Sequence, residues 1–261
     1  DDVVAVETRH VRVELAESTV EVMQASRDIV HAVADGDEAV YGINTGFGAL
    51  SQQRIDPESN RALQLNLIRS HAAGVGELLP DETVRAMQCI LAASLARGHS
   101  GVRPSLVQQI IALLNAGIVP LVPSRGSVGA SGDLAPLSHA ALALLGEGPV
   151  RHNGTVCEAA SALKAAGLEP IALEAKEGLA LINGTHFMAA QAALGLDEIG
   201  RLFDGALIAA AMAFDGSLGT HRVLDARIHE VRCQPGQIEV AAELRALLEG
   251  SIEDRRRCLQ T

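Results

Sequence analysis

Aromatic residues are almost absent from this 261-residue sequence, which holds four Phe, one Tyr and no Trp. Nevertheless, 48% of its residues are hydrophobic, so the core has to be built from Ala, Leu, Val and Ile, which favours closely packed helices. This apolar content excludes a disordered chain, and the 25 Gly residues without a three-residue period exclude a collagen-like one. The lone tyrosine is Tyr41.

Basic residues are scarce. There are 21 Lys and Arg against 32 Asp and Glu, which gives a formal net charge of −11. An acidic surface repels phosphate backbones, so we expect no nucleic-acid partner. The one basic cluster, Arg255 to Arg257, lies close to the end of the sequence and is typical of a solvated charge run.

Zinc patterns, export signals and membrane spans are also missing from the sequence. Its cysteines form no CxxC pair, and neither they nor the histidines show metal-ligand spacing, so no metal site is expected. Scattered cysteines are typical of free thiols in a reducing compartment. No signal peptide is visible, and the longest apolar run, 206–214, is far shorter than the ~20 residues of a membrane span. These absences predict a cytoplasmic protein without a membrane partner.

Caps and apolar periodicity predict a mainly α fold with few strands. Ser18 with Glu21 forms a capping box that predicts a helix to about residue 33, and weak alternation over 3–15 predicts one or two short strands. Asn153-Gly154 predicts a hairpin turn. Further helices are expected over 57–70, 80–97, 104–116, 133–145, 157–166, 173–182, 185–214 and 237–248. The helix over 185–214 is apolar on more than one face, so it has to be buried between neighbours.

A Gly-rich loop carries the chemistry of greatest interest: residues 126–137 read GSVGASGDLAPL. If the loop is compressed, the amide nitrogen of Gly132 can attack the carbonyl of Ala130, and loss of one water closes a five-membered ring. Loss of a second water from Ser131 leaves an exocyclic methylene. The product, methylidene-imidazolone, is a strong electrophile that needs no external cofactor, and a helix beginning near Asp133 would point its positive end at it.

Other interpretations of the loop are an ordinary Gly/Ser connection or an anion-binding nest at a helix N-terminus. A phosphate-binding loop would carry Lys followed by Ser or Thr after its last Gly. Here Asp133 follows Gly132, and its negative charge would repel phosphate. The nucleotide-binding version is therefore disfavoured.

With its neighbours, this loop resembles the signature of the aromatic amino acid ammonia-lyase family, which comprises histidine, phenylalanine and tyrosine lyases and related aminomutases. Three other segments resemble that family in the same order: YGINTGFG at 41–48, RSHAAGVG at 69–76 and KEGLALINGT at 176–185. The similarity extends from about Tyr41 to the end. It implies a helical ammonia-lyase-like N-terminal domain over 1–184 with a few short strands, and the first part of a central long-helix bundle over 185–261.

The resemblance also implies roles for individual residues. Ala130, Ser131 and Gly132 would form the electrophile, and Asp133 would assist the cyclisation. Tyr41 would be the base that removes the weakly acidic β-proton. The substrate would be held by His71, which matches the position that reads the substrate side chain, and by Asn183, which matches a residue near the substrate amine. Taken singly, a Tyr beside Gly is more often a loop packer, a His at a helix end a dipole contact and an Asn before Gly a turn residue.

The implied activity is non-oxidative elimination of ammonia from a small amino-acid substrate. Ser70-His71 resembles the pair in histidine lyases, which favours conversion of L-histidine to urocanate. Some tyrosine lyases and aminomutases also place His there, and a His side chain can hydrogen-bond either an imidazole or a phenol. Tyrosine therefore stays an alternative, whereas phenylalanine is disfavoured because its lyases usually carry an apolar pair at this position.

The resemblance further implies a homotetramer whose active sites are assembled from three subunits, with members about twice as long as this sequence. The sequence is therefore expected to be a truncated enzyme, or half of a split one, that supplies the electrophile side of the site. A catalytically silent fragment that serves as an assembly module is the other hypothesis.

Overall fold

The computed structural model describes residues 2–7, 11–48, 51–128 and 131–251 of the chain. Its backbone contacts divide the chain into two units, Asp1–Leu194 and Gly195–Thr261. The division falls inside the long helix α9 (His186–Gly216), later than the domain boundary predicted after residue 184. Each unit is described by itself.

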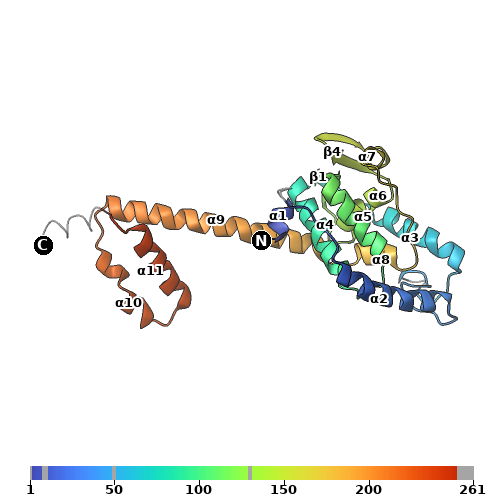
Figure 1. Cartoon of the computed structure of the whole chain (residues 1–261), viewed down its shortest axis with the longest axis horizontal. Coiled ribbons are helices and arrows are strands. Elements are labelled where there is room, and N and C mark those ends of the chain that lie inside the picture. Colours follow the sequence, from blue (N-terminus) through green and yellow to red (C-terminus); the bar gives the residue numbers. More distant parts are fainter. Residues whose placement is uncertain (1, 8–10, 49–50, 129–130, 252–261) are drawn as a thin grey trace. The chain divides into compact units, whose positions relative to one another are not determined.

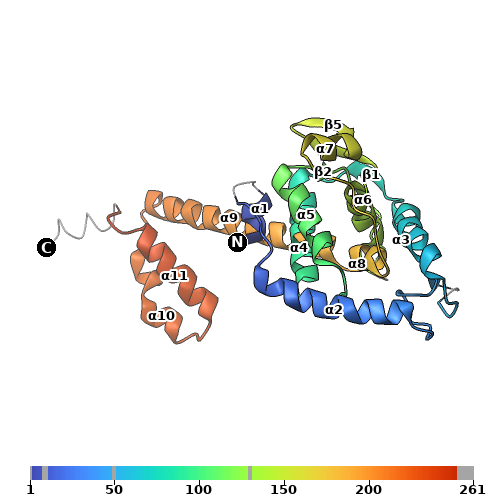
Figure 2. The same cartoon turned by 45° about the vertical axis from the view of Figure 1, so that its right-hand side comes forward.

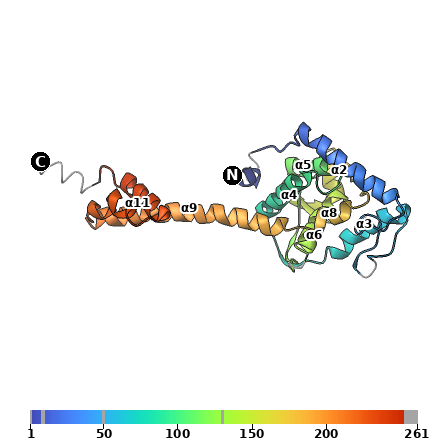
Figure 3. The ribbon, with the colours of Figure 1, turned by 90° about the horizontal axis from the view of Figure 1, so that it is seen from below.

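Helices dominate the first unit, so the predicted mainly α fold is confirmed. Figures 1 and 2 show α4 and α5 side by side, and α6 packs against both α3 and α8 (Figure 3). The helices are α1 (Asp2–Glu7), α2 (Glu17–Asp35), α3 (Pro57–His71), α4 (Asp81–Ala96), α5 (Pro104–Ala116), α6 (Leu134–Leu144), α7 (Ala159–Ala165), α8 (Glu177–Ile182) and the start of α9.

The strands of this unit are short and form two small antiparallel sheets. In one sheet β1 (Val75–Leu78) pairs with β3 (Pro123–Arg125). The other has the order β2-β4-β5, from β2 (Val119–Pro120), β4 (Pro149–His152) and β5 (Thr155–Glu158). Asn153 and Gly154 join β4 to β5 with φ of 52° and 77°, the left-handed backbone that a type I′ turn requires.

Local signals explain the well-predicted helix ends. The Asp56 side chain accepts a hydrogen bond from the Ser59 N–H at 2.8 Å, and Pro57 is the first residue of α3. At the other end of its helix, Gly117 ends α5 with φ of 65°. These caps were readable because they depend only on residues next to one another in the sequence.

Two predictions near the N-terminus are wrong. Where strands were expected over 3–15, residues 2–7 form α1 and residues 11–15 form no strand, while residues 8–10 lie outside the described residues. Val6 of α1 is buried, and its carbonyl accepts a 2.7 Å hydrogen bond from Arg85 of α4. A contact with a distant helix has outweighed the local alternation. The capping box is also absent, because α2 begins at Glu17 with Ala16 as its cap, which places Ser18 inside the helix.

The core of the first unit is a cluster of Leu, Ile, Val, Met and Ala side chains, as the composition requires. Among the fully buried members are Met87 of α4, Leu106 and Ile110 of α5 and Leu137 of α6. Burial of such side chains stabilises the fold by about 1.5–3 kcal/mol each. The core therefore holds α6, and with it the loop that precedes α6, in a fixed place.

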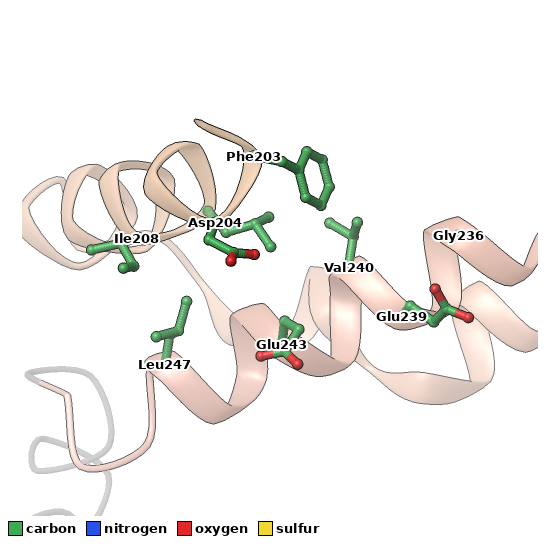
Figure 4. Close-up of a pocket in the computed structure, with 9 residues that line it drawn as sticks. Phe203, Asp204, Ile208, Gly236, Glu239, Val240, Glu243 and Leu247 are labelled. Atoms are coloured by element: carbon green, nitrogen blue, oxygen red, sulfur yellow. The ribbon is translucent and has the colours of Figure 1, made fainter. Parts of the chain in front are cut away.

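The second unit comprises the rest of α9, a short 3-10 helix (His221–Leu224), α10 (Ala226–Glu230) and α11 (Pro235–Leu247). Its buried cluster is small: Ala211, Leu224 and Leu248, packed by Phe214 and Leu244. A groove of about 910 Å³ lies between α9 and α11, and Figure 4 shows Phe203 and Ile208 on one side of it and Val240 and Leu247 on the other.

Helix α9 leaves large apolar side chains exposed, among them Leu196, Ile199, Leu202 and Met212. The stretch Glu177–Gly216 is, within the described residues, the one long and apolar enough to cross a membrane by length and composition alone, a test that core helices of soluble proteins also pass. The prediction that this helix is buried between neighbours is wrong for the described residues, because its large apolar side chains are exposed.

Candidate active site

Asp133 anchors the Gly-rich loop from both sides. Its buried carboxylate accepts a 2.8 Å hydrogen bond from Ser127 Oγ, at the start of the loop, through Oδ1. Through Oδ2 it accepts from the Phe187 and Met188 N–H groups at 2.9 and 3.0 Å. These N–H groups belong to the first turn of α9, where backbone donors have no helical partner. The carboxylate therefore caps α9 and ties that helix to the loop.

The end of the Gly-rich loop at Gly132 and Asp133 contacts the segment 176–185, which contains Asn183. The Asp133 N–H donates to the Gly184 carbonyl at 2.7 Å, and Gly132 has a left-handed φ of 85°. A Cβ at Gly132 would lie 2.2 Å from the Gly184 oxygen, so any other residue would collide with the backbone.

Residues 129–130 lie outside the described residues, so the structure does not place Ala130. Ser131 and Gly132 are described, and Ser131 is exposed while Gly132 is buried. With Ser127 and Asp133 hydrogen-bonded to each other, the span between them is closed at both ends. The described flanks of the loop, with a crowded glycine at position 132, are compatible with the cyclisation that the sequence predicts.

Helix α6 begins at Leu134, immediately after this loop, as predicted. Its N-terminus carries partial positive charge that favours electron flow toward the loop. Asp133 occupies the cap position of α6, but its side chain makes no capping bond to that helix because it caps α9 instead.

Tyr41 lies on a loop that is rigidly held by its own polar side chains. Buried Asn44 accepts from the Val40 N–H at 2.8 Å and donates to the carbonyls of Val33 and Glu38. The Tyr41 ring is 54% exposed and packs edge-on against Phe47, with the ring centroids 6.0 Å apart. The Tyr41 side chain is therefore more than half exposed on a loop that Asn44 holds.

A chain of buried amides connects the Tyr41 loop to α8. Asn60 of α3 donates to the Ile43 carbonyl at 2.5 Å and accepts from Gln64 Nε2 at 3.2 Å. Gln64 Oε1 accepts from the Gly178 N–H at 2.9 Å, at the start of α8. Both amides are almost fully buried, so each hydrogen bond is shielded from water. The loop and α8 thus share one hydrogen-bonded support.

Asn183 ends α8 and is exposed, immediately before the Gly184 carbonyl that receives the Asp133 N–H. The start of α8 is fixed by buried Glu177, which accepts from Arg103 Nε at 2.9 Å and Nη2 at 2.6 Å. Burial on its own opposes ionisation of Glu177, but hydrogen bonds from Arg103 and Glu174 and the charge of Arg103 outweigh it and lower the pKa of this carboxyl.

His71 is the last residue of α3, and its ring has a defined tautomer. Nδ1 lies 2.8 Å from the Leu67 carbonyl oxygen, which can only accept, so Nδ1 carries the hydrogen. In the neutral ring Nε2 is then an acceptor for a donor on a ligand. An imidazole N–H or a phenol O–H supplies such a donor, and a phenyl ring does not.

The structure brings some of the predicted site residues together. Gly132 and Asp133 meet the segment of Asn183, and a Cβ at Gly42 would lie 2.5 Å from the Leu179 side chain of α8, so the Tyr41 loop touches the same helix. Among the described residues, no hydrogen bond joins the side chains of Tyr41, His71 and Asn183 to one another or to Ser131.

Sequence reasoning missed several supporting residues. Gln64 and Asn60 were not singled out, although two amides one turn apart in an apolar helix are a usable signal. His186 was assigned no role, yet its ring packs on Gly184, and burial lowers its pKa while Asp133 opposes that shift. Its buried Nδ1 has no hydrogen-bond partner in the part of the chain that the structure describes.

Comparison with known proteins agrees with these features. The profile of the family described as aromatic amino acid lyase matches residues 1–260. Histidine ammonia-lyase of Rhodospirillum rubrum is 55% identical over 229 residues, which are 88% of this chain and 45% of that protein. The chain spans about half the length of the curated relatives it matches.

Solved structures give the same result. The crystal structure of histidine ammonia-lyase from Trypanosoma cruzi superposes with a TM-score of 0.87 at 40% identity, over 94% of this chain and 47% of that one. Tyrosine aminomutase from Streptomyces globisporus gives a TM-score of 0.89 at 37% identity, over 99% and 50%. The chain belongs to the aromatic amino acid lyase family.

Proposed function

We propose that this chain is the electrophile-bearing part of a histidine ammonia-lyase, a carbon–nitrogen lyase that converts L-histidine to urocanate and ammonia in histidine catabolism. The observation that carries the proposal is the hydrogen bond of His71 Nδ1 to the Leu67 carbonyl, which leaves Nε2 as an acceptor, in a chain whose Gly-rich loop is held at its described flanks by Asp133. Curated relatives at 48–55% identity are histidine ammonia-lyases, which supports histidine, whereas the solved structures of a histidine ammonia-lyase and a tyrosine aminomutase are similarly related to the chain at 40% and 37%.

In this proposal Ala130, Ser131 and Gly132 form methylidene-imidazolone, which supplies an electrophile that makes the substrate amine a better leaving group. Asp133 contributes by fixing both flanks of the tripeptide, which brings the Gly132 nitrogen toward the preceding carbonyl. Autocatalytic closure of this kind requires only the loss of two water molecules, so no external cofactor is needed.

The remaining residues act on the substrate. His71 Nε2 accepts a hydrogen bond from the imidazole N–H of histidine, which orients the side chain. Asn183 lies next to the loop and positions the amine. Tyr41, held by the Asn44 loop, is the base that removes the weakly acidic β-proton.

The proposal extends to the assembly. A homotetramer would cover the apolar face of α9 that this chain exposes and complete the site with residues of other subunits. A cytoplasmic location, a small amino-acid substrate and no nucleic-acid or membrane partner are consistent with the net charge of −11 and with the scattered free cysteines.

The test combines mass and activity. The purified chain should weigh two water molecules less than its sequence, and Ser131→Ala should lose at most one, because ring closure alone releases one water and no methylene can form. Urocanate formation from L-histidine, followed by ultraviolet absorbance, should disappear in Ser131→Ala. A chain with the mass loss but no product from histidine would indicate a silent fragment.

Tyrosine lyase or aminomutase activity is the second candidate, because the structure of a tyrosine aminomutase superposes on this chain and a phenol can donate to His71 Nε2. Assays with L-tyrosine distinguish the two. A higher kcat/KM for tyrosine than for histidine would overturn the proposed substrate and keep the reaction class.

A further inference from the structure

His139 lies on α6, the helix that follows the electrophile loop, and its side chain reaches the segment after His71. The Gly74 N–H donates to His139 Nε2 at 3.1 Å, across 65 positions of the sequence. Nothing in the proposed chemistry uses His139. This hydrogen bond nevertheless connects α6, which follows the Gly-rich loop, to the residues after His71, the proposed contact of the substrate side chain.

The surroundings of Gly74 are crowded. A Cβ at Gly74 would lie 3.2 Å from His139 Nε2 and 3.3 Å from Pro123 Cβ. A Cβ at Gly126, the first residue of the loop motif, would lie 3.3 Å from the Gly74 Cα and 2.8 Å from the Ala135 Cβ of α6. The segment of Gly74, the start of the loop and α6 therefore meet in direct backbone contact.

The hydrogen bond requires one protonation state of His139. Because an N–H donates to Nε2, this nitrogen must be without hydrogen, and the ring is neutral with its hydrogen on Nδ1. Burial lowers the pKa of His139 from its ordinary value near 6.5, which favours this neutral form. Protonation of Nε2 would remove the acceptor and place two donors opposite each other.

Charged neighbours do not account for the lowered pKa, which burial alone causes. Three ionisable groups in α3 and α8 have partners elsewhere: Arg69 donates to Glu147, His71 to the Leu67 carbonyl and Glu177 accepts from Arg103. The titratable and charged residues on the elements packed against α6 are Glu58, Arg61, Arg69 and His71 in α3, Arg125 in β3, Lys164 in α7 and Glu177 in α8.

We propose that His139 is a positioning residue for the substrate-reading segment: its neutral Nε2 holds Gly74, and with it the backbone following His71, against the start of the electrophile loop. Protonation of His139 at mildly acidic pH releases this hold. The anchoring stands on the hydrogen bond itself, and its consequence for substrate binding rests on the function proposed above.

Hydrogen–deuterium exchange of the intact chain tests the anchor, read by mass spectrometry on peptides that contain the Gly74 amide. After correction for the pH dependence of intrinsic exchange, protection should fall by about fivefold between pH 7.5 and pH 5, the effect of losing one ordinary hydrogen bond. Protection in peptides of α4 and α5 should stay unchanged, since their core contains no group that titrates with His139.

Two matched variants separate positioning from general stability. In His139→Gln the side-chain oxygen reaches as far as Nε2 and does not titrate, so protection should be retained at both pH values. In His139→Asn the amide is too short to reach Gly74, so protection should be low at both. Equal protection in all three proteins, or a pH-dependent fall that persists in His139→Gln, would overturn the proposal.

If His139→Asn does not fold, the comparison of wild type with His139→Gln over pH decides alone. Urocanate assays run beside these experiments keep the two proposals apart. Loss of the exchange pattern with urocanate formation intact contradicts the anchor only. The expected pattern without any urocanate supports the anchor and contradicts the proposed function.

Discussion

The two units of this chain differ in the hydrogen bonding of their polar side chains and in the burial of their apolar ones. In the first unit, buried polar residues such as Arg27, Gln64 and Glu177 are hydrogen-bonded to residues far away in sequence, around one large apolar core. In the second unit the buried cluster is small, and α9 exposes Leu202 at 68% and Met212 at 71%.

This difference indicates two different sources of stability. The first unit has its own core and a polar framework that holds the described flanks of the Gly-rich loop. The second unit exposes a continuous apolar helix face, which in a water-soluble protein is usually covered by other protein surface. The proposed tetramer would provide that cover.

The largest expected effect is a difference in unfolding free energy between matched Ile→Ala substitutions, one in each unit. Ile110→Ala, at a fully buried site of α5, should lower the unfolding free energy by about 3 kcal/mol because it leaves a cavity. Ile199→Ala, at a site of α9 that is 62% exposed, should change it by less than about 0.5 kcal/mol. Urea denaturation measures both, and equal losses would contradict the comparison.

The next effect concerns the carboxylate that joins the loop to α9. Asp133→Ala leaves the Phe187 and Met188 N–H groups and the Ser127 hydroxyl without their acceptor, and should cost about 2–3 kcal/mol. Asp133→Asn retains an acceptor oxygen of the same size and should cost less. If both variants unfold at the wild-type urea concentration, Asp133 does not anchor the loop.

A smaller effect should depend on pH. The pKa of Glu177 is lowered in the folded chain from about 4.5, so its ionised form stabilises the fold above that pH, and this contribution is lost as the pH falls through the folded-state pKa. Glu177→Gln should therefore cost about 2 kcal/mol at pH 7 and progressively less below pH 4.5. Denaturation curves at pH 7 and pH 3 measure the difference, and a cost independent of pH would rule out this explanation.

The smallest effect is expected from an exposed ion pair in the second unit. Hydrogen bonds from Arg227 lower the pKa of Asp225 to about 2, which an NMR titration of its carboxyl carbon can measure. Because solvent screens this pair, Asp225→Asn should shift the melting temperature less than Glu177→Gln does. The opposite ranking would mean that the second unit depends on its polar contacts as much as the first.

Sequence signals located most helices and the order of the site segments because these signals are local. The Asp56-Pro57 start and the Gly117 end of helices require only neighbouring residues. Residues 3–15 were misassigned because the carbonyl of Val6 bonds Arg85, a partner that no local pattern reveals. The pairing of β1 with β3 likewise joins segments about 50 residues apart.

The candidate site likewise contains residues that the sequence identifies and supporting residues that it does not. Motif spacing identified Tyr41, His71, Ser131 and Asn183, whose place in the reaction is a proposal. The supports of these residues were not predictable, since Gln64 reaches Gly178 across 114 positions and His139 reaches Gly74 across 65. A side chain whose role is defined by a distant backbone group leaves no signature in its own sequence neighbourhood.

The most direct test of the account is the intact mass of the purified chain, because the central claim is that the loop closed by Ser127 and Asp133 is compressed enough to cyclise. The account predicts a mass lower than the sequence mass by two water molecules, located to the peptide that contains Ser131, and a loss of at most one water molecule for Ser131→Ala. The full, unmodified mass for the wild-type chain would contradict it.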